Sequence, residues 1–171
     1  MTAPVAECAA DACAPVARGA PSGGTPQINP ATGLSTDYLN HFSEAIMALE
    51  MVAIMPECAD DLRTWRPKSY CQHFAASNFT NRDAAIAAYA AADRAAVEVL
   101  ERTVDALDPV LLQARDVVLA HLGTPAAGEL ARRAVAWLRP LVARAAAAIN
   151  GKPATAFGRN TQAEIDAIFT P

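Results

Sequence analysis

The sequence predicts an all-α protein, a single bundle of about five helices with a disordered N-terminal leader and a short C-terminal helix. From residue 36 onward, apolar side chains recur every three or four positions, which is the period of a helix with one buried face. No stretch alternates apolar and polar residues over the length of a strand. Of the 171 residues, 53% are apolar, which is enough for the core of one domain.

Residues 1–33 are predicted to be the disordered leader, and residues 34–171 the helical domain. The leader holds five of the 12 prolines and four of the eight glycines of the chain. These residues do not sustain a helix and bury little apolar surface, so we expect a tail before the bundle.

The first helix is predicted to follow Ser35 or Thr36, either of which can cap the amide groups of the next turn. Its apolar positions have helical spacing and are Leu39, Phe42, Ile46, Leu49 and Ala53. Pro56 should end it, and a short turn of helix should then carry Leu62 and Trp65 onto the core.

Two further helices are predicted in the middle of the chain. Residues 68–78 place Tyr70 and Phe74 on one face. Thr80 with Asp83 resembles a capping arrangement that begins the next helix, and the alternative is that the preceding helix continues there with a bend. The apolar stripe of that helix is predicted to contain Ile86, Ala90, Asp93, Val97, Leu100, Val104 and Leu107.

Prolines mark most of the predicted helix boundaries in the rest of the chain. Asp108 followed by Pro109 predicts a new helix, because a proline in the first turn costs no hydrogen bond, and Gly123 should end it. Thr124 with Pro125 repeats the signal for a helix that runs to Asn150, with a kink at Pro140. The residues from Thr161 to Glu164 match a capping box that opens the C-terminal helix.

Charge and cysteine usage limit the partners and the compartment. The net charge of −4 and the pI near 5.3 give no basic field, so we expect neither nucleic acid nor membrane as a partner. The charge is uneven: residues 1–108 carry 7 basic and 14 acidic side chains (−7), and residues 109–171 carry 7 and 4 (+3). With no secretory signal pattern and no zinc-ligand spacing among the four cysteines, we expect a cytoplasmic protein with reduced thiols.

Glu50 interrupts an otherwise apolar run from Ala45 to Met55. Three interpretations are open: a position at the core boundary with the carboxylate in water, an ion pair with Arg132, Arg133 or Arg139, or a role with a ligand or a proton. The boundary position is the commonest of these arrangements. The same interruption makes the run too short to cross a membrane.

The histidines are the other candidate site residues. Asp37, His41 and Glu44 share one helix face, and bundles build metal sites from imidazoles and carboxylates. The His-x-x-Glu pattern of His41 and Glu44 occurs once, and its order is the reverse of the Glu-x-x-His found in di-iron bundles. A solvated helix face is therefore favoured over a metal site. His73 lies close to Cys71 in sequence, but residues two apart on a helix point away from each other and form no catalytic dyad. His121 is expected to cap a helix C-terminus.

We therefore expect a small soluble regulatory or scaffolding protein that binds another protein or a second copy of itself. The methionines of the first helix suit an adaptable contact surface. The alternative is a metal- or small-ligand-binding bundle, possibly an enzyme, that uses Asp37, His41, Glu44 and Glu50, with His73 or His121 from a facing helix. A phosphotransfer role for an exposed His41 is a third hypothesis. No cofactor, metal or reaction follows from the sequence alone.

Overall fold

The structure is a computed structural model that describes residues 26–52, 54–153 and 162–169. In these residues it contains seven α-helices, two short 3-10 helices and no strand, which confirms the predicted all-α class. The elements are η1 (Thr36–Leu39), α2 (Asn40–Val52), η2 (Pro56–Cys58), α3 (Ala59–Thr64), α4 (Tyr70–Ala76), α5 (Arg82–Ala90), α6 (Arg94–Ala120), α7 (Pro125–Ile149) and α8 (Gln162–Phe169).

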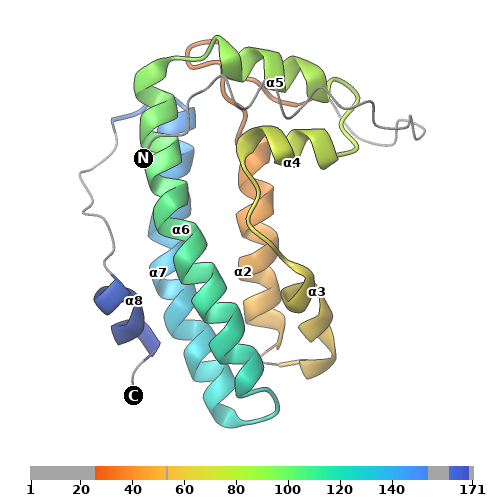
Figure 1. The fold of residues 1–171 in the computed structure, drawn as a ribbon, viewed down its shortest axis with the longest axis vertical. Coiled ribbons are helices and arrows are strands. Elements are labelled where there is room, and N and C mark those ends of the chain that lie inside the picture. Colours follow the sequence, from red (N-terminus) through yellow and green to blue (C-terminus); the bar gives the residue numbers. More distant parts are fainter. Residues whose placement is uncertain (1–25, 53, 154–161, 170–171) are drawn as a thin grey trace.

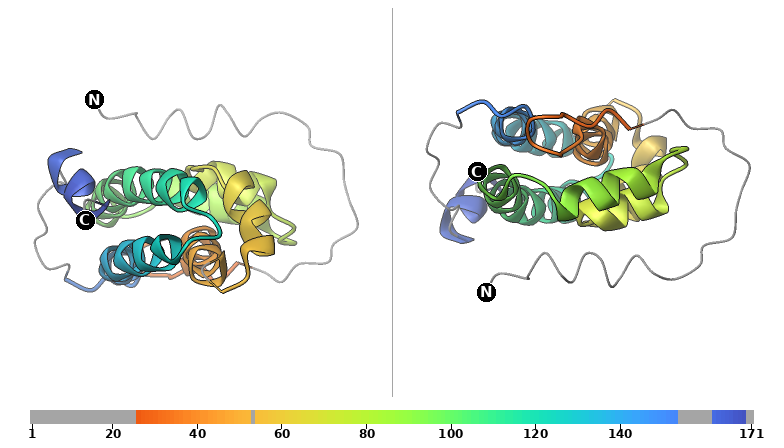
Figure 2. Two further views of the ribbon diagram at one scale, coloured as in Figure 1. Left: turned by 90° about the horizontal axis from the view of Figure 1, so that it is seen from below. Right: turned by 90° about the horizontal axis from the view of Figure 1, so that it is seen from above.

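The helices form two layers around one core (Figures 1 and 2). The long helices α6 and α7 make an antiparallel hairpin with the most extensive helix contact of the fold, and α2 packs beside α7. The shorter helices α3, α4 and α5 lie in the layer of α6, while α8 lies against the outside of the α6–α7 pair. The described part of the chain contains no helix long and apolar enough to span a membrane.

The hairpin of α6 and α7 forms because both helices present a continuous apolar stripe. The stripes are built from buried leucine, valine and alanine residues: Leu100, Leu107, Leu111, Ala114 and Val118 in α6, and Leu130, Ala134, Leu138, Leu141 and Ala145 in α7. Alanine favours helix and lets two backbones approach closely. The predicted single core is therefore present, and it extends from this pair onto α2 and α4.

Helix α6 passes through Pro109 without ending, so the predicted helix boundary at Asp108 and Pro109 is wrong. A proline inside a helix removes one hydrogen bond and clashes with the preceding turn. Here the ring is exposed, and the apolar stripe continues on both sides of it through the buried Leu107 and Val110. Packing on α7 thus outweighs the local preference of the dipeptide.

The break between helices falls instead at Asp93, which the sequence analysis placed in an apolar stripe. Its carboxylate accepts a hydrogen bond from the Ala96 amide at 2.9 Å and caps the start of α6. The start of α5 also differs from the prediction, because its capping position is Asn81 and not Thr80. Short polar residues serve as caps or as helix-surface residues, and periodicity alone does not separate the two uses.

Residues 26–35, most of which were assigned to the leader, form a turn that packs on the bundle. The buried Thr32 donates its hydroxyl to the Ile149 carbonyl at 2.6 Å, and the Asp93 amide donates to the Thr32 carbonyl at 2.9 Å. Leu34 is fully buried. The predicted boundary at residue 34 therefore falls inside a packed turn, whereas residues 1–25 of the predicted leader lie outside the described residues.

Gly33 is required in this turn for two reasons. Its φ is +76°, and a Cβ would lie 3.1 Å from the Ala92 Cα and 3.2 Å from the Ala88 carbonyl oxygen. We expect Gly33→Ala to lower the free energy of unfolding by about 2–3 kcal/mol, from backbone strain plus steric overlap. Gly123 is the matched control, since its φ is +82° but no atom lies within 4 Å of a Cβ built there.

We expect Gly123→Ala to cost only the strain, about 1 kcal/mol. Urea denaturation of both variants, followed by circular dichroism, measures the difference. Equal losses of stability in the two variants would show that the close approach of Gly33 to α5 contributes nothing.

Cys71 is buried at the start of α4 and is disulfide-bonded. The prediction that the thiols stay reduced is therefore wrong for this cysteine.

Candidate functional site

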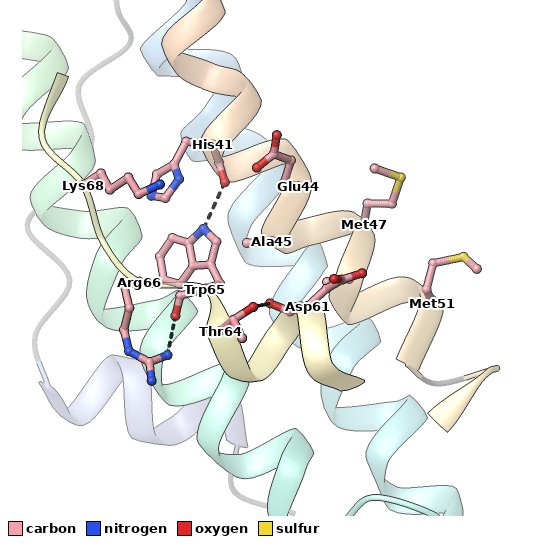
Figure 3. A pocket seen from close by; sticks show the side chains of 11 residues that line it. His41, Glu44, Ala45, Met47, Met51, Asp61, Thr64, Trp65, Arg66 and Lys68 are labelled. Carbon is pink, nitrogen blue, oxygen red and sulfur yellow. Dashed lines mark hydrogen bonds between the residues drawn. The ribbon is translucent and has the colours of Figure 1, made fainter. Parts of the chain in front are cut away.

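A groove of about 640 Å³ lies between α2 and the segment that contains α3 (Figure 3). Its walls come from one face of α2, from α3 and from the extended residues that follow α3. The lining residues are His41, Glu44, Ala45, Met47, Ala48, Met51, Asp61, Thr64, Trp65, Arg66 and Lys68. The volume is in the range of pockets that hold a small ligand or a few side chains of a partner.

The α2 wall of the groove is apolar and open to solvent. Met47 is 58% exposed, and Met51 one turn later is half-buried. Ile54, just beyond the end of α2, is 79% exposed. Of the three exposed large apolar residues in the described part of the chain, Met47 lies in α2, Ile54 lies just beyond it, and Trp137 lies on α7. Contiguous exposed apolar surface is the usual mark of a binding face.

Charged side chains lie at opposite ends of the groove (Figure 3). Glu44 and Asp61 stand near Met47 and Met51, whereas Arg66 and Lys68 extend near the ring of Trp65. The Arg66 guanidinium donates to the carbonyls of Arg63 and Trp65 at 2.6 and 2.7 Å. These two hydrogen bonds hold the Arg66 side chain near Trp65. Positive charge therefore lies at one end of the groove and negative charge at the other.

Trp65 forms the floor of the groove and fixes the segment after α3 onto α2. Its indole Nε1 donates to the His41 carbonyl at 3.0 Å. The indole also stacks on the imidazole of His41, with ring centroids 5.0 Å apart and an interplanar angle of 21°. The predicted aromatic contact of Trp65 with the core is thus present, and it covers His41.

His41, which stacks on Trp65, lies next to His73, with the ring centroids of the two histidines 6.0 Å apart. His41 comes from α2 and is 3% exposed, while His73 comes from α4 and is half-buried. The Nε2 atoms of both rings are buried and have no hydrogen-bond partner. Burial lowers the pKa of His41 to about 4, with the charges of His73 and Lys68 acting in the same direction, and burial also lowers the pKa of His73.

The structure separates the candidate residues of the first helix. His41 is buried and Glu44 is exposed, so the predicted solvated face shared by Asp37, His41 and Glu44 is wrong for His41. The Asp37 carboxylate accepts from the Ser35 hydroxyl at 2.9 Å and the Gln27 amide at 2.8 Å. Burial of His41 also contradicts the exposed imidazole that a phosphotransfer role requires.

Glu50 lies at the surface and pairs with Arg139 at 2.6 Å. The side chains of Arg139 and Glu50 are 64% and 45% exposed, so the boundary position and the ion pair, which were separate interpretations, are both present. An exposed pair of this kind contributes little to stability. Glu50 is not among the residues that line the groove.

His121 is the C-cap residue of α6, and its Nδ1 lies 2.8 Å from the Val117 carbonyl oxygen, in agreement with the predicted capping position. His121 does not line the groove, as His41 does, and it makes no ring contact with His41 or His73 among the described residues. No group of three or more histidine, cysteine or acidic side chains with metal-binding geometry occurs in the described ranges.

Comparison of the chain with models of protein families, with curated proteins and with solved structures finds no match.

The sequence analysis missed the cationic end of the groove and its floor as parts of a site. Lys68 was considered only as the start of a helix, and Trp65 only as a core residue. The capping box of Ser69 and Gln72, which is present in full in the structure, was a readable signal that α4 begins after an extended segment. That segment is what places Trp65, Arg66 and Lys68 against α2.

Proposed function

We propose that the protein acts as a small regulatory or scaffolding protein that binds an amphipathic helix of a partner protein in the groove between α2 and α3. The single observation that carries this proposal is the exposed Met47, with the half-buried Met51 one turn later, on the α2 wall of a formed groove; the exposed Ile54 follows just beyond α2. Methionine side chains are flexible and polarizable, and they adapt to apolar partners of different shapes.

A helix is the favoured form of the bound segment. The described part of the chain has no strand, so it offers no sheet edge to which an extended peptide could add. The groove is bordered by helix α2 and the short helix α3, and an apolar helix face fits between such walls through residues at positions i, i+3, i+4 and i+7.

The charged side chains of the groove indicate which charges the partner helix carries and in which direction it lies. Lys68 makes no ion pair within the described residues and lies at the end of the groove that holds Trp65. An acidic side chain at the corresponding end of the bound helix would complement Lys68 and Arg66. A basic side chain at the other end would complement Glu44 and Asp61. We therefore propose a partner helix with an apolar face and this polarity of charge.

The first test is photo-crosslinking in the source cell from a photoreactive residue at Met47, with the same probe at Glu98 on the exposed surface of α6 as control. We expect a crosslink from position 47 alone, to a partner segment whose sequence has helical apolar period and an acidic end. A product with the mass of two copies of this chain would indicate self-association and contradict the proposal. Equal labelling from both positions would contradict it as well.

The second test uses a synthetic peptide of the crosslinked segment. We expect the double variant Met47→Glu, Met51→Glu to bind it at least about tenfold more weakly, because each buried methionine contributes about 1.5–3 kcal/mol. Isothermal titration calorimetry measures the affinity. Glu98→Lys is the control for a surface charge change away from the groove, and a similar loss in that variant would argue against a defined site.

The disulfide of Cys71 gives information about the cellular compartment in which the protein is located. Disulfides persist in oxidising compartments and are rare in the cytosol, so this bond favours an oxidising location over the cytoplasmic location predicted from the sequence. Alkylation of native cell extracts with a mass-shifting maleimide, before and after reduction, distinguishes the two. Four reactive thiols before reduction would restore the cytoplasmic prediction, because the chain has four cysteines.

A further inference from the structure

Two neighbouring imidazoles whose Nε2 atoms are buried without a hydrogen-bond partner are an uncommon arrangement, and the energetic cost of these two atoms points to a ligand. The Nε2 atoms of His41 and His73 have no hydrogen-bond partner, and a buried polar atom without a partner costs about 1–3 kcal/mol. Such atoms in a folded protein call for an explanation, for example a bound ion. Apolar residues of the same shape would fill this position without the cost.

The hydrogen bonds of the other ring nitrogen, Nδ1, determine whether Nε2 presents a lone pair to a ligand. Hydrogen bonds to the backbone of Arg66 and of Asp37 act on His41 and His73, respectively, and both raise the pKa slightly against the effect of burial. Because Nε2 is unpartnered in each ring, these bonds fall to Nδ1. An imidazole that donates Nδ1–H to a carbonyl and is otherwise neutral presents a lone pair at Nε2, which is the arrangement found in metal-binding histidines.

The ring separation agrees with a shared metal ion. With metal–nitrogen bonds of about 2.0–2.1 Å, two imidazoles on one ion have ring centroids roughly 5–6.5 Å apart, depending on the angle at the metal. The centroids of His41 and His73 are 6.0 Å apart. Of the two histidines, His41 also lines the groove.

We propose that His41 and His73 bind one Cu(I) ion through their Nε2 atoms. The described residues supply no third histidine, cysteine or acidic ligand at this position, which disfavours four-coordinate Zn²⁺. The positive charge of Lys68, which acts on both imidazoles, repels a monovalent ion less than a divalent one. Imidazole is a common ligand of copper.

The test is an anaerobic titration in which the full chain competes for Cu(I) with a chromophoric chelator. We expect one equivalent bound by the wild type, and this equivalent lost in His41→Phe and in His73→Phe. Phenylalanine keeps an aromatic ring of similar size between the neighbouring rings, and circular dichroism checks the fold. His121→Gln is the control, because His121 caps α6 away from the groove, and this variant should bind one equivalent.

Two further measurements keep the proposal falsifiable if His41→Phe does not fold. X-ray absorption of the copper-loaded wild type should show two imidazole nitrogens, and long-range ¹H–¹⁵N spectra of the metal-free protein should show the Nδ1–H tautomer for His41 and His73. No transfer of copper from the chelator, binding unchanged in His73→Phe, or tighter binding of Zn²⁺ than of Cu(I) would each overturn the proposal. The groove would keep its proposed protein partner in all three cases.

Discussion

Replacement of Trp65 by alanine is expected to lower the free energy of unfolding by about 3–5 kcal/mol, the range for removal of a buried tryptophan. The indole is 8% exposed, stacks on His41 and donates to the His41 carbonyl at 3.0 Å. Its loss leaves a cavity beneath the groove and frees the extended segment after α3 from α2. Urea denaturation followed by far-ultraviolet circular dichroism measures the change without relying on tryptophan fluorescence.

The second tryptophan is the matched control for this variant. Trp137 on α7 is 39% exposed, so we expect Trp137→Ala to cost no more than about 1 kcal/mol. Trp65→Phe should lie between the two alanine variants, because it keeps an aromatic ring but removes the indole hydrogen bond, which is worth about 0.5–1.5 kcal/mol. Similar losses in Trp65→Ala and Trp137→Ala would refute the role of Trp65 as the link between the groove floor and α2.

Replacement of Asp108 by asparagine is expected to stabilise the protein above neutral pH. Burial raises the pKa of the Asp108 carboxyl to about 7, with the nearby charge of Asp105 acting in the same direction, and its Oδ1 has no hydrogen-bond partner. A carboxyl whose pKa is raised on folding stabilises the fold while it is protonated. This contribution is complete below the unfolded pKa near 3.9 and is lost as the pH rises through 7.

The difference in unfolding free energy between Asp108→Asn and the wild type should therefore depend on pH. We expect the variant to be more stable by about 1–3 kcal/mol at pH 8, and the advantage to disappear towards pH 5. His41 and His73 also change the stability in this range, but they are present in both proteins and cancel in the comparison. A difference that is constant from pH 5 to pH 8 would show that Asp108 does not titrate with a raised pKa.

The helical class and most helix positions could be predicted because they depend on local signals. The apolar period of α6 and α7 and the serine cap at Ser35 lie within a few residues of the elements they define. Pro109 was misassigned because packing across the α6–α7 pair decides its role. Asp93 was misassigned because its carboxylate caps α6, a use that periodicity alone does not reveal. Local preference predicted a boundary where tertiary contacts maintain a continuous helix.

The candidate site could be predicted only in part, because it depends on distant residues. His41 was assigned to a solvated face because its pattern with Glu44 occurs once and in the reverse order to that of di-iron bundles. Its burial comes from Trp65, which is 24 positions later, and from His73 on another helix. Nothing in the local sequence indicates that the chain after α3 returns along α2. For Glu50 the pattern named Arg139 among three arginines, but the choice among them required the crossing of α2 and α7.

The hydrogen bond from Thr32 to the Ile149 carbonyl spans 117 positions of the chain. A ribosome that makes the chain from its N-terminus must add nearly all of the last long helix before this turn finds its acceptor. Until then, α2 also lacks the surface of α7 on which it packs, and the nascent bundle exposes apolar side chains. Completion of the core therefore awaits the synthesis of α7.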